Sequence, residues 1–299
     1  MTGLAARGTL RQRAFVGVQY LLPQHLLSRL VFIATRVAAA PWKNFLIRNF
    51  MKRFAVDLSE AQQSDPSAFA SFNDFFTRAL RPDARPIDAV PQAIVSPVDG
   101  TVSAAGRIEG QQLLQAKGRS YTLEALLAGD RALVEAFRDG EFATLYLAPF
   151  NYHRIHMPVT GTLTATIHVP GRLFSVNTAT AAQVPGLFAR NERVICTFDT
   201  DCGRLAMILV GALFVGSMAT IWAGDITPST RRRITVLTAP SSPVELARGA
   251  EMGRFNMGST VILLCEQGRI RWLDALREGT DVRMGERIGE CIRRSHERR

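Results

Sequence analysis

The sequence has few of the residues on which metal, redox and lysine-dependent chemistry rely. Its four cysteines show no C-x-x-C spacing and no neighbouring histidine pair, so we expect neither a metal site nor a redox motif. Only three lysines are present, and two of them, Lys43 and Lys52, lie among basic residues near the start. The third, Lys117, lies in no recognisable cofactor motif, which disfavours a pyridoxal-type enzyme. With no cleavable signal peptide recognised, we expect free thiols in a reducing cytoplasm.

Acidic residues are missing from the first 56 positions, which contain nine arginines and lysines. Because the whole chain carries a formal charge of +10, the remainder is almost neutral, and we expect no nucleic-acid partner. None of the apolar stretches between the basic residues reaches the ~18 to 20 uninterrupted residues of a membrane-spanning helix. The pattern favours amphipathic helices in a bilayer interface, with arginines among anionic headgroups. The alternative is a helical hairpin packed on the protein's own core, with its arginines solvated.

In the rest of the chain the sequence pattern changes from one typical of helices to one typical of short strands. Residues 71–80 predict a short amphipathic helix, residues 81–86 predict a linker, and short β-type runs begin at Ile94. Strands are expected at residues 101–102, 142–147, 163–169, 193–198, 205–215, 219–222, 234–237 and 260–265, and further helices at 121–127 and 131–137. We therefore predict an α+β fold, with amphipathic N-terminal helices and a linker over residues 1–90 and a β-rich domain over residues 91–299.

Two short segments contain side chains suited to acid–base chemistry. In residues 96–100, Asp99 lies in a proline–glycine turn after an apolar run, and an Asp before Gly is by itself usually turn chemistry. In residues 152–158, His153 and His156 are three positions apart, which separates them to opposite faces of a strand but brings them together in a helix or turn. No third metal ligand lies nearby, and a structural role for the histidines is an equal alternative.

A third segment, residues 251–264, places Gly258 and Ser259 before an apolar run, which alone would indicate a glycine turn that opens a strand. Together, Asp99, His156 and Ser259 form a set in which the carboxylate orients the imidazole and the imidazole removes the hydroxyl proton. An activated serine can attack an external carbonyl, as in a hydrolase, or the carbonyl before it in its own chain. The G-x-S-x-G elbow is absent, and Gly258 tolerates the strained geometry of internal attack, so the local sequence favours self-attack.

Several ordered motifs resemble those of the phosphatidylserine decarboxylases, specifically the long bacterial type. The family's Leu-Gly-Ser-Thr cleavage signature reads M-G-S-T at residues 257–260, and the Leu-to-Met change keeps an apolar residue of similar volume. Its Pro-Ala-Asp-Gly reads P-V-D-G at residues 97–100, and its Tyr-His-Arg-Val-His-Met-Pro reads Y-H-R-I-H-M-P at residues 152–158. Further similar stretches are residues 72–76, 115–118, 174–177, 191–196 and 222–224, so the resemblance spans roughly residues 15–290.

The resemblance implies a proenzyme that cuts itself between Gly258 and Ser259. His156, held by Asp99, would take the hydroxyl proton of Ser259. The serine oxygen would then attack the preceding carbonyl in an N-to-O acyl shift, for which an intramolecular nucleophile has a large effective concentration. After β-elimination and hydrolysis, a covalent pyruvoyl cofactor would stand at position 259.

The same resemblance implies the products and the reaction. A β chain, residues 1–258, and an α chain, residues 259–299, would remain associated, and the processed unit is compatible with a homodimer. The pyruvoyl ketone would form a Schiff base with the amine of phosphatidylserine and release CO2 and phosphatidylethanolamine. The β-rich domain is then catalytic, and His153 is expected to position or protonate the substrate, with a purely structural role as the alternative.

A lipid substrate also accounts for the basic amphipathic segment. Phosphatidylserine lies in an anionic membrane, so we expect a peripheral protein on the cytoplasmic face of the cell membrane. Two other functions are considered: a serine hydrolase that acts on lipid esters with Asp99, His156 and Ser259, and a non-enzymatic lipid-surface scaffold. A pyruvoyl decarboxylase of a soluble amino acid would have no use for the amphipathic segment.

Overall fold

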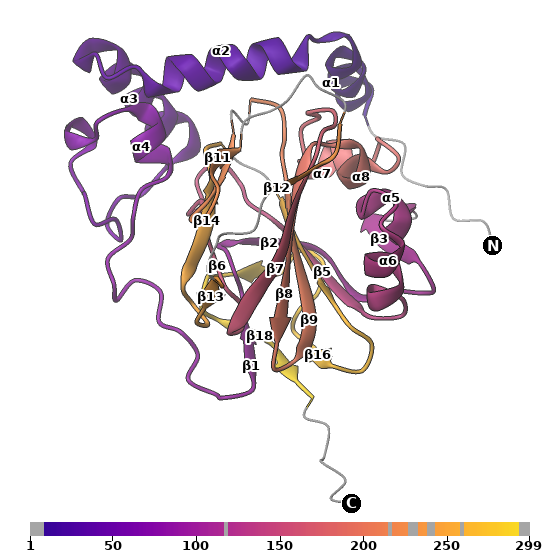
Figure 1. The fold of residues 1–299 in the computed structure, drawn as a ribbon. Coiled ribbons are helices and arrows are strands. Elements are labelled where there is room, and N and C mark those ends of the chain that lie inside the picture. Colours follow the sequence, from indigo (N-terminus) through magenta and orange to yellow (C-terminus); the bar gives the residue numbers. More distant parts are fainter. Residues whose placement is uncertain are drawn as a thin grey trace, which may run out of the picture.

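The centre of the structure is an antiparallel sheet (Figure 1). Apolar side chains pack on both of its faces. The computed structural model describes residues 9–116, 119–214, 217–226, 233–237, 243–257 and 260–292. The strands of the large sheet are β2 (Gly100–Arg107), β5 (Glu141–Tyr146), β7 (Gly161–Val169), β8 (Arg193–Thr200), β9 (Gly203–Val210), β12 (Thr235–Leu237), β13 (Glu245–Leu246), β15 (Thr260–Cys265) and β17 (Asp281–Val282). Among the described residues these nine strands run in the order β12-β7-β8-β9-β15-β5-β2-β17, with β13 also paired to β7.

Strand β15 lies in the middle of this sheet, between β5 and β9. Successive residues of a strand point to opposite faces, so Ile262 and Leu264 enter one core cluster while Val261 and Leu263 enter the other. All six residues of the strand are buried. Burial on both faces explains why this part of the sequence is a continuous apolar run without polar alternation.

Short helices and a smaller sheet cover the two faces of the large sheet. One face packs on α5 (Leu123–Leu126), α6 (Arg131–Phe137), α7 (Thr178–Ala181), α8 (Leu187–Arg190) and the hairpin of β3 (Gln112–Ala116) and β4 (Arg119–Thr122). The other packs on a four-stranded sheet with the order β11 (Gly224–Ile226), β10 (Met218–Thr220), β14 (Glu251–Phe255) and β6 (Arg154–His156). A third sheet joins β1 (Ala93–Val95), β18 (Arg287–Cys291) and β16 (Ile270–Trp272).

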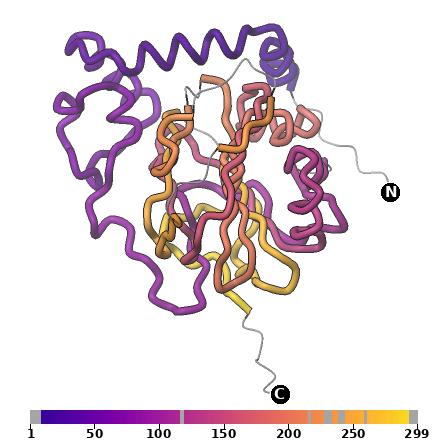
Figure 2. The backbone as a smooth tube through the Cα atoms, in the orientation of Figure 1, coloured from indigo at the N-terminus to yellow at the C-terminus, as the bar shows by residue number. Residues whose placement is uncertain are grey.

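The N-terminal helices lie along one end of the molecule, opposite the C-terminal strands (Figures 1 and 2). They are α1 (Leu10–Leu21), α2 (Gln24–Arg36) and α3 (Ala40–Phe54), followed by the 3-10 turn η1 (Pro66–Ala68) and α4 (Phe72–Phe76). After α4 the chain descends along the side of the molecule to β1 at the far end (Figure 2). This descending linker places residues near position 85 against the sheet end where β2 begins.

Helices α1 and α2 bury mainly polar side chains, unlike an ordinary surface helix, whereas α3 and α4 bury Ile47 and several phenylalanines. Gln19 and Gln24 are buried, and their side-chain oxygens accept hydrogen bonds of 2.8 and 2.9 Å from the backbone amides of Ser175 and Leu173. The outward faces instead expose large apolar side chains: Leu10, Phe15, Val18, Leu21, Leu26, Leu30, Ile33, Trp42 and Phe45. Within the part of the chain that the structure describes, no single helix is long and apolar enough to cross a membrane, and only the pair α2 and α3, bent by 113°, meets that test jointly.

The predicted α+β class is confirmed, and each run expected to be a strand contains one. The helix expected over residues 71–80 ends at Phe76, because Ala79 and Leu80 instead pair with residues 61–62. The helix expected over residues 121–127 begins only at Leu123, since the residues before it form β4 and pair with β3. The boundary between residues 90 and 91 stays a prediction, although the first strand of the core begins shortly after it.

The expectation of four free thiols is wrong for two of the cysteines. Cys202 and Cys291 form a disulfide that joins positions 89 residues apart in the sequence. Cys196 and Cys265 are buried free thiols, and burial raises the pKa of the Cys196 thiol to about 12. The pairing could not be read from spacing, because the two cysteines meet only through the fold.

The packing of β15 predicts a large stability difference between two leucines. Leu264→Ala should lower the free energy of unfolding by about 2 to 5 kcal/mol, because it leaves a cavity in a fully buried site. Leu114→Ala, at a leucine that is 46% exposed, is the matched control and should cost less than about 1 kcal/mol. Denaturant unfolding of both variants measures this, and equal losses would contradict the central placement of β15.

Candidate active site

His156 is held on β6 as a neutral imidazole of fixed tautomer. Its Nδ1 lies 2.8 Å from the carbonyl oxygen of Gly249, which can only accept, so Nδ1 carries the proton. Its Nε2 lies 3.0 Å from the Tyr152 hydroxyl, which therefore donates to it. Burial lowers the pKa of His156 below its ordinary value, while the carbonyl of Gly249 and the charge of Glu251 oppose that shift. The ring is thus a base with its acceptor nitrogen directed at a hydroxyl.

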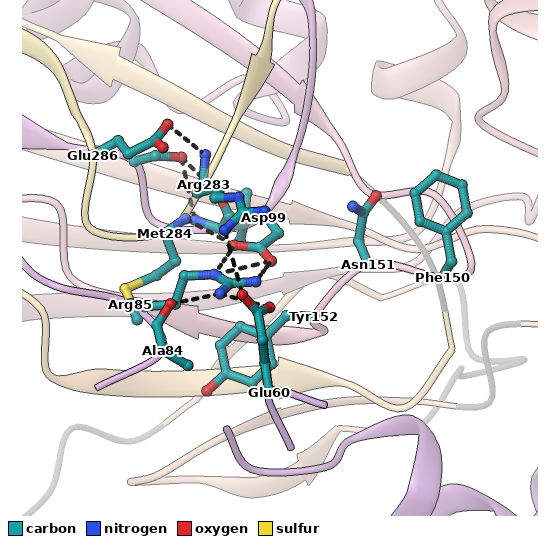
Figure 3. Close-up of polar contacts among 12 residues, drawn as sticks. Glu60, Ala84, Arg85, Asp99, Phe150, Asn151, Tyr152, Arg283, Met284 and Glu286 are labelled. Carbon is teal, nitrogen blue, oxygen red and sulfur yellow. Dashed lines mark hydrogen bonds and ion pairs between the residues drawn. The ribbon is translucent and has the colours of Figure 1, made fainter. Parts of the chain in front are cut away.

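Asp99 lies at the turn into β2 and is bound by an arginine from the linker (Figure 3). Arg85 donates from Nε to Oδ1 at 2.9 Å and from Nη2 to Oδ2 at 2.6 Å, and both side chains are buried. The backbone amide of Met284 donates to Oδ1 at 2.9 Å. On its other side Arg85 pairs with Glu60 at 2.9 Å. The pKa of Arg85 is raised, chiefly by its hydrogen bonds to Asp99.

The structure brings Asp99 and His156 into neighbouring segments but not into a direct hydrogen bond. The amide of His156 donates to the carbonyl of Pro97 at 2.9 Å, so the two segments run side by side. The described residues show no Asp99–His156 hydrogen bond, which differs from the expected arrangement. The reason is geometric: a planar guanidinium and a backbone amide already occupy the carboxylate oxygens. The carboxylate still acts on the imidazole through space, where its charge favours the protonated ring.

His153 lies just before β6 and is fully buried. Its Nδ1 donates to the carbonyl of Asn151 at 2.8 Å, and its ring centroid lies 4.1 Å from that of Phe76. Its Nε2 has no hydrogen-bond partner among the described residues. Burial lowers its pKa to about 3, so the ring is neutral near pH 7 with an unused lone pair. The extended backbone gives the two histidines different environments, as the spacing predicts for a strand.

Gly258 and Ser259 lie outside the described residues, but their neighbours on both sides are placed. Phe255 donates its amide to the carbonyl of His153 at 3.0 Å, which brings the end of β14 beside that histidine. Thr260 begins β15 and pairs with Tyr146 on one side and Val210 on the other. The described residues before position 258 therefore border the segment that carries His153, and those after position 259 enter the large sheet.

An apolar pocket of about 270 Å³ opens beside this segment. Its walls include Phe50 and Phe54 of α3, Phe76 of α4, Tyr146 at the end of β5, and Met257. Sequence reasoning missed this pocket, because its walls come from six separate parts of the chain. The available signal was the density of phenylalanine in residues 69–76, several of which pack edge to face with Phe50. The residues that the structure describes contain no cluster of three or more side chains suited to hold a metal ion.

Comparisons with known proteins show the family to which the chain belongs. The family model described as phosphatidylserine decarboxylase matches residues 72–290, and a second, described as PSD, matches residues 14–55. The chain belongs to the phosphatidylserine decarboxylase family, as its motifs predicted.

Relatives match over nearly their whole length. The chain is 52% identical over 279 residues to the phosphatidylserine decarboxylase proenzyme of Methylococcus capsulatus, covering 93% of this chain and 97% of the relative. It is 51% identical over 287 residues to that of Azotobacter vinelandii, covering 94% and 99%. It is 52% identical over 280 residues to that of Bordetella bronchiseptica, covering 93% and 94%.

The buried histidines predict a pH dependence of stability. An imidazole that is neutral when folded but binds a proton when unfolded makes the free energy of unfolding fall as pH drops below the unfolded pKa of about 6.5. For His153 this fall continues to its folded pKa of about 3. As pH falls from 6 to 4, the free energy of unfolding should therefore decrease by about 1.4 kcal/mol less per pH unit in His153→Gln than in the unaltered protein. Denaturant unfolding at several pH values measures the slopes, and parallel slopes would show that His153 titrates normally.

Proposed function

We propose that this protein decarboxylates phosphatidylserine to phosphatidylethanolamine and CO2, after cutting its own chain between Gly258 and Ser259. The observation that carries the proposal is the match to phosphatidylserine decarboxylase proenzymes over 93% of the chain, with a family model that spans the segment of His153 and His156 and the residues around position 259. The word proenzyme in those names supports activation by cleavage.

For self-cleavage, His156 is the proposed base. Its proton lies on Nδ1, so Nε2 has the free lone pair. This nitrogen can accept the Ser259 proton directly if the Tyr152 hydroxyl moves away, or through that hydroxyl if it relays the proton. Taking that proton creates an imidazolium in a buried site, which the charge of Asp99 favours. Asp99 thus acts as a charge held in place by Arg85 and not as a hydrogen-bonding orienter. That arrangement weakens the serine hydrolase alternative, whose triad needs the direct carboxylate–imidazole contact.

The residues next to position 259 fit a pyruvoyl group. His153 offers a buried Nε2 with no partner in the described part of the chain, and Met257 lines the adjoining apolar pocket. A pyruvoyl group formed from Ser259 would supply a ketone that draws electrons from the substrate during loss of CO2. With its low pKa, His153 is neutral near pH 7, so its Nε2 can accept a hydrogen bond. We therefore assign it to substrate positioning or protonation.

The two chains proposed to result from cleavage would remain associated. Residues 259–299 include β15, which is the central strand of the large sheet, and β17 and β18, which pair with β2 and β1. Removing them would expose both core clusters to water, which opposes dissociation. A homodimer of the processed unit stays a proposal from the resemblance.

We also propose that the N-terminal helices seat the protein on the cytoplasmic face of the cell membrane. Their apolar side chains face outward while their glutamines bind the core, which suits burial of the outward face among lipid chains. Acidic residues are absent from the first 56 positions, so anionic headgroups meet only basic side chains there. Phe50 and Phe54 of α3 also line the pocket, which places the pocket wall on the same helical unit.

Replacing the proposed nucleophile tests the reaction. The unaltered protein should run as two chains on a reducing, denaturing gel, with a small chain that resists amino-terminal sequencing. Ser259→Ala should remain one chain and release no CO2 from phosphatidylserine. Ser120→Ala, at an exposed serine, is the control and should behave as the unaltered protein. A full-length chain that reacts with a fluorophosphonate would favour the hydrolase, and lipid binding without any reaction would favour the scaffold.

Replacing exposed apolar residues of α2 tests the membrane proposal. Leu26 and Ile33 are 57% and 55% exposed, so Leu26→Ser/Ile33→Ser should weaken binding at least about tenfold through lost apolar burial. Co-sedimentation with vesicles of phosphatidylserine and phosphatidylcholine measures this. Leu114→Ser/Ile292→Ser removes two comparably exposed residues outside the helices and should leave binding unchanged. Equal binding by both double variants would contradict the proposed seating.

A further inference from the structure

The segment just before residue 258 is held by a buried polar network. The Asn256 amide donates to the carbonyl of Ser217 at 3.1 Å. The Asn256 side-chain nitrogen donates to the hydroxyl of Ser217 and to Oδ1 of Asp225, the latter at 3.3 Å. Asn73 donates its side-chain nitrogen to the Asn256 carbonyl at 3.1 Å. Asn256 and Ser217 are each 1% exposed and Asn73 is 9% exposed, so the bonds among these three residues are shielded from water, whereas the Asp225 side chain is 41% exposed.

Burying the Asn256 side-chain amide costs free energy unless its hydrogen bonds are formed as observed. Its neighbours Phe255 and Met257 pack into apolar clusters, so a one-residue shift of the chain would bury the Asn256 amide without partners. The network therefore fixes the register of this segment, since the bonded arrangement is favoured over its slipped alternatives.

The network also extends to the N-terminal helices. Arg36, the last residue of α2, donates from Nη2 to the Ser217 hydroxyl at 3.4 Å and to Oδ2 of Asp225 at 3.3 Å. Asn73 belongs to α4. Two helices outside the β-rich core thus contact the Asn256 network. Helix α4 binds Asn256 directly through Asn73, and α2 binds its partners Ser217 and Asp225 through Arg36.

We infer that Asn256, with Asn73 and Asp225 as its partners, is a positioning residue for the self-cleavage reaction. The inference rests on the proposed cleavage at Gly258–Ser259. Downstream, Thr260 is fixed between two strands, and upstream, Asn256 is fixed by the network. Both ends of the short stretch that carries the scissile bond are therefore anchored. Intramolecular attack depends steeply on placement, because a displacement of about 1 Å can cost on the order of 100-fold in rate.

An exchange of the two side chains tests the network itself. Asn256→Asp removes the donor that reaches Asp225 and places two carboxylates face to face. Adding Asp225→Asn restores the hydrogen bond with donor and acceptor reversed, while the Ser217 hydroxyl can donate instead of accept. We expect Asn256→Asp to slow self-cleavage at least about tenfold, and the double variant to return to within about threefold of the unaltered rate.

The rate is measured by pulse-labelled cell-free synthesis followed by timed reducing gels. Each substitution is also made together with Ser259→Ala, where thermal unfolding reports folding apart from cleavage. Asn49→Asp is the matched control, because Asn49 also donates its side-chain amide to a backbone carbonyl but lies outside the network. If the Asn256→Asp precursor does not fold, Asn73→Ser, which removes only the donor to the Asn256 carbonyl, carries the same expectation.

The outcomes separate this inference from the proposed function. Slow cleavage in a folded Asn256→Asp protein, restored by the exchange, supports the positioning role. Cleavage at the unaltered rate in folded Asn256→Asp, or no recovery in the folded double variant, overturns it. An unaltered protein that never divides overturns the proposed cleavage as well.

Discussion

The place of Thr260 at the start of the central strand constrains the whole site. Strand β15 forms hydrogen-bonded ladders with β5 and β9, so the chain after position 259 cannot shift without disrupting both. The core clusters on each face add to that resistance. Upstream of the same point, β14 pairs with β6, which contains His156 and directly follows His153.

Environment, more than residue type, sets the chemistry of the two histidines. The ring of His156 lies between a carbonyl and a phenol, whereas the ring of His153 packs on Phe76 and its Nε2 has no hydrogen-bond partner in the described part of the chain. Both are neutral because burial penalises the charged form. Asp99 is buried as well, and its carboxylate is paired with the guanidinium of Arg85.

The sequence allowed the strands, the fold class and the family to be predicted, because alternating or continuous apolar runs and ordered motifs are local signals. Contacts between residues distant in the sequence could not be predicted from these local signals. Nothing near Asp99 indicated that Arg85 would occupy its oxygens, and the triad pattern suggested a different partner. The helix expected to reach Leu80 stops at Phe76, since pairing with residues 61–62 outweighs local propensity. Gly258 and Ser259, the centre of the sequence argument, lie outside the described residues, so their roles stay predictions.

The disulfide between Cys202 and Cys291 has a consequence for what cleavage would mean physically. The two cysteines lie on opposite sides of the proposed scissile bond, so the severed backbone would still be one covalent molecule. Processing would then be a nick in a cross-linked loop, invisible to electrophoresis until a thiol reductant opened the bridge. Conversion of Ser259 to a pyruvoyl group takes up one water and releases one ammonia, so the total mass changes by only about one dalton. Mass spectrometry of the unreduced protein would therefore show almost no change.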